Sequence, residues 1–563
     1  MSLTSGARSW LERDHPVWVC LLPALALLPW LDKAFHIDDT LFLLYARLIS
    51  GHPFDPFVQH FEWDSMQISI IDFPHPLLWQ YLLAGVRAVF GESEVAMHLL
   101  TFAFGLLALA GLRGLAVRLR VPPLAACVLM AGSCGFLVMG STIMPDLAAM
   151  ALSVAALDRL VPAVEEQNGR DAWLSGALGG FAFLTRFTAL FAVGSLLLYP
   201  LMRRDWRVRS YVPVAVALAL VVASEAASFA IAGRPHFISS LFRWTTDSSW
   251  LRDIYFAFNE LTFLGAQFPV TGLVLLAVAA RGARSIAVVF VSGAVAVSVG
   301  VFGLGVGHGL TIAALLFAWP GLALVGDSAL RLASGIADRF DAPDAGTALR
   351  WIFALTLIAT TFATVRYEHV AVKYLLMPLP AAILLLLDGL NELRGRARSA
   401  GAIVLWLSCA VGGATGLGVA LSDYRWANTY REFIDGEFRD RMPARGRTFY
   451  NAQWGLRYYA ERAGLLPYRG DELASDDQLL MSTMVPPDWE TDRLPRGVVR
   501  SWELSYPGPF AILSFEHRAG FYSNRWGVYA FAPSDRVSDT IFLLRTRAPA
   551  TDAKPGKSFS RGP

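Results

Sequence analysis

Charged residues are scarce in this chain: only 17% of its 563 residues are Asp, Glu, Lys or Arg. Soluble globular domains contain about 25% charged residues, so a soluble protein is excluded. Hydrophobic residues make up 55%, and apolar runs recur over the first 420 positions. These runs are about 20 residues long, which is enough to cross a bilayer. The sequence therefore predicts a polytopic α-helical membrane protein.

Cysteine is also rare. All four cysteines lie in apolar runs: Cys20, Cys127, Cys134 and Cys409. This placement indicates neither a disulfide framework nor a cysteine metal site. The net charge of +2 does not indicate a nucleic-acid partner, because the Lys and Arg residues gather at the ends of the apolar runs.

The basic residues beside the apolar runs predict the topology, because Lys and Arg are enriched in cytoplasmic loops. Arg8 and Arg13 place the N-terminus in the cytoplasm, before an uncleaved first span over residues 17–30. About 13 spans follow this rule, and an odd number places the C-terminus outside. We expect a transmembrane domain (1–421) with a large first outer loop (31–94), a small extracytoplasmic α/β domain (422–547) and a disordered tail (548–563). The membrane is expected to be a bacterial-type inner (plasma) membrane.

The sequence predicts more detailed secondary structure in two regions, residues 172–202 and the C-terminal domain. Residues 172–202 begin and end beside cytoplasmic loops, so they predict two short helices that turn near Thr185-Arg186-Phe187; the alternative is one tilted span. In the C-terminal domain, alternating apolar residues predict strands at 447–452, 511–515, 526–531 and 540–545, and a helix at 455–463.

Asp38 and Asp39 stand where the first span leaves the bilayer. Ionisable residues at membrane depth are costly and mark functional sites. Asp is also a favoured N-cap, and a helix is predicted to begin at Thr40, but one cap accounts for only one Asp. We therefore interpret the pair as functional.

Other polar residues are predicted on the same outer side. They include His75, Asp146, Arg186, Arg366 and Lys373. A transporter is expected to spread polar residues through the bilayer midplane. Their concentration at one interface favours an enzyme that works at the outer surface, with a lipid or glycan transporter as the alternative.

A divalent metal site is a further alternative. Carboxylate and imidazole side chains suit several metals, and four such residues of the first outer loop are candidate ligands. Their spacing matches no closed structural site, so a metal cofactor is left open. The candidate ligands are His52, His60, Asp64 and Asp72.

Several motifs, in their order along the chain, resemble those of GT-C-fold glycosyltransferases, in the group that includes protein O-mannosyltransferases and lipid A aminoarabinose transferases (glycosyltransferase family 39-like). Asp39 stands where the family has Glu, and His75 where it has Pro. The motifs are His36-Ile37-Asp38-Asp39-Thr40, Tyr45-Ala46-Arg47, Pro74-His75-Pro76-Leu77, Met144-Pro145-Asp146 and Lys373-Tyr374-Leu375-Leu376.

The resemblance implies transfer of a monosaccharide from a polyprenyl-phosphate carrier, within membrane lipids, to a glycan, lipid or protein acceptor, with inversion. It makes Asp38 the general base, while Asp39 orients the acceptor or a metal and Asp146 positions the acceptor, Asp38 or a cation. An oligosaccharide ligase or polymerase on the same fold is an alternative. The sugar, the acceptor, the oligomeric state and the role of the C-terminal domain are left open.

The departing phosphate requires positive charge, and three basic residues are candidates. Arg366 and Lys373 are seven residues apart and would share one face of a helix that began at Tyr367. The alternatives are that Arg366 ends a span, that Lys373 pairs with Glu368 or His369, and that Arg186 extends to the interface. The motif residues His75, Tyr45 and Tyr374 are candidates for contact with the acceptor or for packing of its loop.

Overall fold

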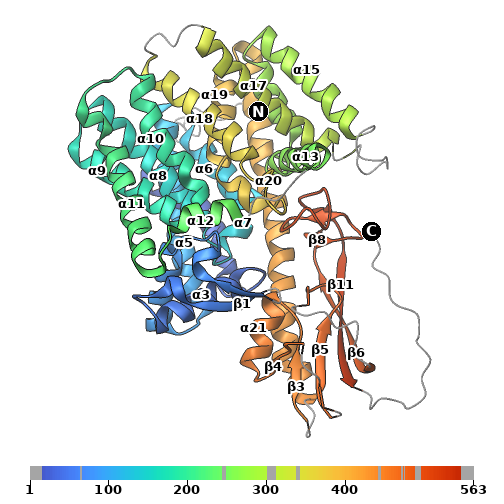
Figure 1. Cartoon of the computed structure of the whole chain (residues 1–563). Coiled ribbons are helices and arrows are strands. Elements are labelled where there is room, and N and C mark those ends of the chain that lie inside the picture. The colour runs from blue at the N-terminus through green and yellow to red at the C-terminus, as the bar shows by residue number, and fades with distance from the viewer. Residues whose placement is uncertain are drawn as a thin grey trace.

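The computed structural model describes residues 15–63, 66–243, 249–300, 312, 314–337, 343–441, 446–470, 473–474, 476–487 and 496–546. Asp64 and the predicted tail (548–563) lie outside these residues. A large helical part is followed by a smaller part that contains most of the strands (Figure 1). The predicted class, a helical membrane protein with a C-terminal α/β region, is therefore confirmed.

The helical part begins with the predicted first span and the predicted first outer loop. These contain α2 (Pro16–Ala24), η1 (Leu25–Trp30), α3 (Asp39–Gly51), η2 (Pro56–Val58), β1 (His60–Trp63), β2 (Met66–Ser69), η3 (Ile70–Asp72) and α4 (Leu78–Phe90). β1 and β2 pair antiparallel as a hairpin. The remaining helices are α5 (Glu94–Arg118), α6 (Pro123–Gly132), α7 (Cys134–Gly140), α8 (Asp146–Glu165), α9 (Gly169–Thr185), η4 (Phe187–Ala189), α10 (Leu190–Met202), η5 (Val208–Tyr211), α11 (Val212–Ala232), α12 (His236–Arg243), α13 (Trp250–Ala266), α14 (Thr271–Ala279), α15 (Ala283–Ser298), η7 (Ala314–Ala318), α17 (Trp319–Ala337), α18 (Ala345–Phe362), η8 (Val372–Leu376), α19 (Leu379–Asn391) and α20 (Gly395–Phe433).

The number of membrane crossings follows from the apolar helices. In the part of the chain that the structure describes, six helices are long and apolar enough to cross a membrane, and two bent helix pairs would raise this number to eight. Further apolar helices of 10–17 residues are present. The multi-pass prediction is confirmed, while the count of about 13 and the orientation of the termini stay predictions.

The hairpin predicted within residues 172–202 is present. α9 ends at Thr185, Arg186 is extended, and α10 begins at Leu190 after one short turn. A continuous helix would place a charged guanidinium in the middle of an apolar span, which is costly. The break instead turns Arg186 into the protein interior, where the residue is 9% exposed.

The C-terminal part contains a five-stranded sheet in the order β4-β3-β5-β11-β6. β3 is parallel to β4 and β5, and β11 is antiparallel to β5 and β6. Its elements are η9 (Ile434–Phe438), η10 (Arg439–Arg441), β3 (Thr448–Tyr450), α21 (Trp454–Arg462), β4 (Leu466–Pro467), β5 (Gln478–Ser482), β6 (Arg496–Pro507), β7 (Phe510–Ala511), β8 (Leu513–Ser514), β9 (Ala519–Gly520), β10 (Ala532–Pro533) and β11 (Arg536–Thr546).

The strand predictions were partly right. β3, β11 and α21 agree with them, and residues 511–515 form two short strands. The strand predicted over 526–531 is wrong, because this stretch is bent and irregular and makes one isolated bridge at Tyr529. β6 was missed although its buried Trp502 and Tyr506, with half-buried Leu504 between them, show the period of two that marks a strand.

The long helix α20 joins the two parts of the molecule (Figure 1). Its last turns carry Trp426 and Tyr430, which are buried. The Trp426 ring stacks on Tyr506 of β6, with 6.0 Å between ring centroids, and the Tyr430 hydroxyl donates to Asp539 of β11 at 3.0 Å. The sheet is therefore fixed to the end of α20 by buried aromatic contacts.

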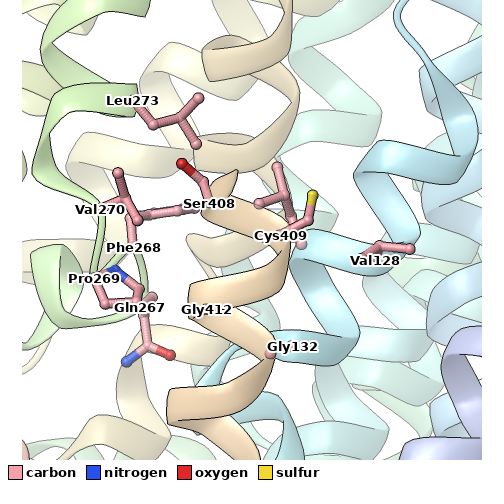
Figure 2. Close-up of a pocket in the computed structure, with 12 residues that line it drawn as sticks. Val128, Gly132, Gln267, Phe268, Pro269, Val270, Leu273, Ser408, Cys409 and Gly412 are labelled. Carbon is pink, nitrogen blue, oxygen red and sulfur yellow. The ribbon is translucent and has the colours of Figure 1, made fainter. Parts of the chain in front are cut away.

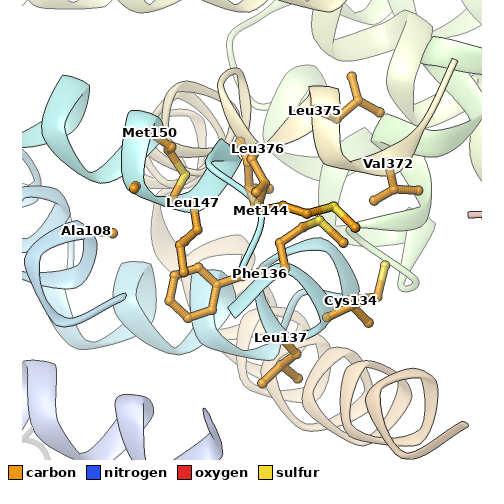
Figure 3. Close-up of a cluster of buried hydrophobic side chains, with 14 of the residues drawn as sticks. Ala108, Cys134, Phe136, Leu137, Met144, Leu147, Met150, Val372, Leu375 and Leu376 are labelled. Atoms are coloured by element: carbon orange, nitrogen blue, oxygen red, sulfur yellow. The ribbon is translucent and has the colours of Figure 1, made fainter. Parts of the chain in front are cut away.

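A cluster of buried apolar side chains lies where α7, α8 and η8 meet (Figure 3). Met144 and Leu147 flank Asp146 in the sequence, and Val372 and Leu375 flank Lys373. All four side chains belong to the same core. Packing of this cluster therefore brings the segments of Asp146 and Lys373 together.

Candidate functional site

The centre of the site is an ion pair between Asp38 and Lys373. The Oδ2 atom of Asp38 lies 2.5 Å from the Nζ atom of Lys373, although 335 positions separate them. Asp38 occupies the N-cap position of α3, yet its side chain makes no capping hydrogen bond. The capping alternative therefore does not account for Asp38, and its carboxylate faces the cation of η8.

The charge state of Asp38 follows from its surroundings. Burial raises the pKa of its carboxyl, but the charge and hydrogen bond of Lys373, with a smaller contribution from Arg186, outweigh burial and lower this pKa below its usual range. The carboxylate is thus ionised at neutral pH. Its side chain is 27% exposed, so a substrate has access to it.

The backbone before Asp38 has an uncommon conformation. Ile37 has φ +48°, in the left-handed region that a β-branched residue rarely adopts. The Asp39 amide donates to the His36 carbonyl at 3.0 Å, and the Thr40 hydroxyl donates to the Ile37 carbonyl at 3.2 Å. Such local strain concentrates at functional sites, and here it accompanies the turn that presents Asp38.

Asp39 has different contacts. It is fully buried, and its two oxygens accept hydrogen bonds from the backbone amides of His36 at 3.1 Å and Ile143 at 2.9 Å. Burial raises the pKa of its carboxyl to about 7. These contacts fasten the loop before Asp146 to the start of α3, so Asp39 holds backbone rather than facing an acceptor or a metal.

A second ion pair joins Asp146 and Arg186. The Oδ1 atom of Asp146, at the start of α8, lies 2.9 Å from the Nε atom of Arg186 at the break between α9 and α10. Arg186 also lies 3.3 Å from Nδ1 of His75 and 5.5 Å from the centroid of the Tyr374 ring. Since a guanidinium only donates, Nδ1 of His75 is the acceptor. Burial, and then the charge of Arg186, lowers the pKa of His75 well below its usual value, so this imidazole is neutral.

Tyr374 links the two ion pairs. The ammonium of Lys373 and the guanidinium of Arg186 each lie 5.5 Å from its ring centroid. Its hydroxyl contacts Nε2 of His369 at 3.2 Å. Burial, and then the charge of Lys373, lowers the pKa of His369 to about 3. The site therefore combines two carboxylates and two cations around one aromatic ring, with both imidazoles neutral.

Two predicted residues lie elsewhere. Arg366 is 67% exposed and pairs with Asp253 at 3.1 Å. The helix assumed over Tyr367 is absent, because α18 ends at Phe362 and extended residues lead into η8. Tyr45 packs its ring 5.0 Å from that of Phe61, in the core under the first outer loop.

The four candidate metal ligands do not meet. Asp72 pairs with Arg234 at 2.6 Å, and His52 contacts Asp55 at 3.5 Å on the surface. His60 is exposed at the start of β1. Across the described ranges, no three His, Cys, Asp or Glu side chains gather as they would around a metal ion. Asp64 falls outside those ranges.

The sequence analysis missed a buried ion pair beside the site. Lys33 and Asp423 are both fully buried and contact each other directly. Lys33 follows the first span on its predicted outer side, against the cytoplasmic preference of basic residues. That exception was the signal that could have identified it.

A pocket between α6, the bend of α13 and α14, and α20 lies apart from these residues (Figure 2). Its lining is mainly apolar, with the polar side chains of Gln267 and Ser408. The side-chain Oε1 of Gln267 accepts from the Gly135 amide at 2.9 Å, at the start of α7. This pocket contains none of the candidate site residues.

Comparison with known proteins supports the resemblance. The family model described as dolichyl-phosphate-mannose-protein mannosyltransferase matches residues 74–229, a range that includes His75, Asp146 and Arg186. The resemblance to GT-C-fold glycosyltransferases that the motifs indicated is thereby confirmed. A search of curated proteins returned no match.

Solved structures were also compared. ArnT from Cupriavidus metallidurans bound to undecaprenyl phosphate has 16% identity and a TM-score of 0.40, over 84% of this chain and 94% of that chain. Archaeal oligosaccharyltransferase AglB from Archaeoglobus fulgidus, in complex with an inhibitory peptide and a dolichol-phosphate, has 14% identity and a TM-score of 0.47, over 81% and 64%. The S. cerevisiae protein O-mannosyltransferase Pmt1-Pmt2 complex bound to the sugar donor has 17% identity and a TM-score of 0.32, over 44% and 37%.

Proposed function

We propose that this protein is a membrane glycosyltransferase that moves a monosaccharide from a polyprenyl-phosphate carrier to an acceptor, on the outer face of a bacterial-type inner membrane. The observation that carries the proposal is the 2.5 Å contact between Asp38 and Lys373. Asp38 was predicted as the base and Lys373 as the phosphate cation, from motifs far apart in the chain. Their convergence is what transfer from a phosphate leaving group requires.

The reaction conserves atoms and charge as follows. The acceptor hydroxyl or amine attacks the anomeric carbon, and a bond forms there. The bond from that carbon to the phosphate oxygen breaks, and polyprenyl phosphate leaves with the electron pair. Asp38 accepts the acceptor proton. Attack opposite the leaving group inverts the configuration of the anomeric carbon.

The ion pairs suggest how the donor is received. Without donor, Lys373 and Arg186 are neutralised by Asp38 and Asp146. A donor phosphate bound to Lys373 would neutralise part of the ammonium charge and weaken the ion pair with Asp38. The Asp38 carboxylate would then be able to accept the acceptor proton. Arg186 would add a second positive charge, and Asp146 would keep the guanidinium in place. The neutral His75 and Tyr374 would line the space beside the sugar.

The arrangement of the molecule supports an enzyme that works at one membrane surface. The first outer loop and the C-terminal sheet lie at the same end of the helical part (Figure 1). Asp38 directly precedes α3, and Lys373 lies in the short helix η8. A transporter remains the alternative of another class, and an oligosaccharide ligase or polymerase remains the alternative on the same fold.

The test uses purified protein in liposomes, supplied with synthetic polyprenyl-phosphate monosaccharides that carry labelled sugars. Transfer to glycan, lipid or peptide acceptors, with release of the polyprenyl phosphate and an inverted product, is expected for the wild type and not for Asp38→Asn. Movement of the labelled lipid across the bilayer without release of sugar would establish the transporter instead. Transfer only from donors with longer glycans would establish the ligase or polymerase. Mass spectrometry of surface glycans from cells with and without the protein would identify the sugar and the acceptor.

A further inference from the structure

The segment that leads to Asp38 is held by residues from the C-terminal half of the chain. The backbone amide of Ala34 donates to Oδ1 of Asn428, near the end of α20, at 2.9 Å. The amide of Phe35 donates to the hydroxyl of Tyr459, on α21, at 2.9 Å. Since the Tyr459 hydroxyl in turn donates to Glu94 at 2.5 Å, its lone pair is free to accept from Phe35.

The segment that leads to Lys373 is held by a different part of the same domain. The amide of Val370 donates to Oδ1 of Asn524 at 2.9 Å, and the amide of Asn524 donates back to the Val370 carbonyl at 2.8 Å. The amide of Val372, directly before Lys373, donates to the Phe521 carbonyl at 2.9 Å. Through these bonds, residues 521–524 lie alongside residues 370–372, much as one short strand lies beside another.

The loop that makes these bonds is itself fixed within the C-terminal domain. It follows β9, which pairs with β8, and the amide of Phe521 donates to the Ile512 carbonyl at 2.9 Å. Asn524 is 3% exposed and Val370 is fully buried. The hydrogen bonds between the two segments are therefore shielded from water, where loss of a partner is costly.

Asp423 connects the two sets of contacts. One carboxylate oxygen contacts the ammonium of Lys33, next to Ala34, and the other accepts from the hydroxyl of Tyr522 at 2.8 Å. Lys33 and Asp423 are fully buried, and Tyr522 follows Phe521 in the chain. One buried carboxylate thus contacts a residue beside each of the two segments.

We infer that the C-terminal region (residues 423–524) positions the two halves of the site, through Tyr459 for the Asp38 segment and through Asn524 for the Lys373 segment. Tyr459 and Asn524 are positioning residues, because they contact backbone and not the reacting groups. This inference rests on the proposed function for what is positioned, but the contacts themselves do not depend on it. A displacement of about 1 Å at a reacting group is enough to cost on the order of 100-fold in rate.

The experiment compares two variants with matched controls in the full-length protein. Tyr459→Phe is isosteric and removes only the hydroxyl; Tyr458→Phe makes the same change one residue earlier on α21, where the hydroxyl faces Glu92. Asn524→Ala removes the acceptor of the Val370 amide; Ser523→Ala changes the neighbouring residue, whose hydroxyl accepts within its own loop. The readouts are amide hydrogen exchange, measured by mass spectrometry, and affinity for undecaprenyl phosphate.

We expect Tyr459→Phe to speed exchange in residues 33–38 about tenfold, as loss of one buried hydrogen bond does, and to leave affinity for undecaprenyl phosphate unchanged within about twofold. It should lower the kcat of sugar transfer by about 10- to 100-fold. Asn524→Ala should speed exchange in residues 370–376 and weaken undecaprenyl phosphate binding about tenfold, because the cation of Lys373 is displaced. Both controls should match the wild type.

Two results would overturn the inference. In the first, amide hydrogen exchange in both variants equals that of their controls, which would show that these contacts do not hold the two segments. In the second, exchange rises but affinity and kcat do not change, so the contacts do not position the site. Failure of the wild type to bind undecaprenyl phosphate or to transfer sugar would count against the proposed function, and the exchange data would still decide whether the C-terminal region holds the two segments.

Discussion

The ammonium of Lys373 lies 2.5 Å from the carboxylate of Asp38, and it keeps the pKa of this partly exposed acid below the usual range of Asp. The pair has two consequences. The Asp38 carboxylate is held ionised at neutral pH, and under the proposed function the Lys373 ammonium lies where the donor phosphate would bind. Each consequence can be tested with a substitution on one side of the pair.

Asp38→Asn removes the proposed base without changing side-chain size. We expect kcat for sugar transfer to fall about 100-fold or more, which is the contribution of a positioned general base. The matched control is Asp32→Asn on the same loop, where the side chain is exposed and should leave kcat unchanged. Near-normal turnover of Asp38→Asn, with intact folding by size-exclusion chromatography, would move the role to Asp146.

Lys373→Ala removes the proposed phosphate cation. The apparent donor KM should rise and kcat should fall, because the same charge binds the carrier and stabilises the leaving phosphate. The acceptor KM should change little. Lys373→Arg should keep part of the activity, since charge matters more than shape at a single phosphate contact. Unchanged donor kinetics in Lys373→Ala would assign the phosphate to Arg186.

The pH dependence of activity should also change with Lys373. In the wild type, Lys373 lowers the pKa of Asp38, so activity is lost only when the pH falls below the usual range of Asp. In Lys373→Met, burial is no longer outweighed and the pKa of Asp38 rises. The acid limb of kcat/KM should therefore move to higher pH, whereas Lys373→Arg should keep it near the wild-type position. An unmoved limb in Lys373→Met would show that another group is the base.

Asp39 should make the stability of the folded protein depend on pH, because its pKa is raised whereas that of Asp38 is lowered. Its folded-state pKa is raised to about 7, so the folded protein holds a proton that the unfolded chain has released between about pH 4 and 7. The contribution of Asp39 to the free energy of unfolding is therefore greatest at low pH and falls, by up to about 4 kcal/mol, as the pH rises to 7. Thermal unfolding in detergent should show the wild type losing stability relative to Asp39→Asn between pH 5 and 7.5. The stability difference between the wild type and Asp38→Asn should not change over this window, because Asp38 titrates below it.

Labelling of introduced cysteines tests the orientation, because the four native cysteines are buried. Ser538→Cys lies on an exposed position of β11, and Ser399→Cys lies on an exposed position near the start of α20, in a region predicted to be cytoplasmic. A membrane-impermeant maleimide should label Ser538→Cys in intact spheroplasts and Ser399→Cys only after permeabilisation. The reverse pattern would invert the predicted topology.

The local sequence determined the membrane class, the hairpin broken at Arg186 and much of the C-terminal secondary structure. These features depend on apolar run length, on the cost of a charge inside a span and on alternation along a strand, and each is visible within about 20 residues. Asp38 and Arg186 were recognisable because charged residues at membrane depth are costly, whereas Asp146 and Lys373 were singled out by motifs that resemble those of the family.

Only the tertiary structure decided which of these residues meet. It separated the adjacent Asp38 and Asp39 into a partner of Lys373 and an acceptor for backbone amides, and it left Arg366 on the surface with Asp253. It also placed Lys33 against Asp423. These pairings join segments more than 100 positions apart, and their geometry is set by packing of the whole core. The sequence shows which charged side chains require a partner when buried, but the fold determines which residue that partner is.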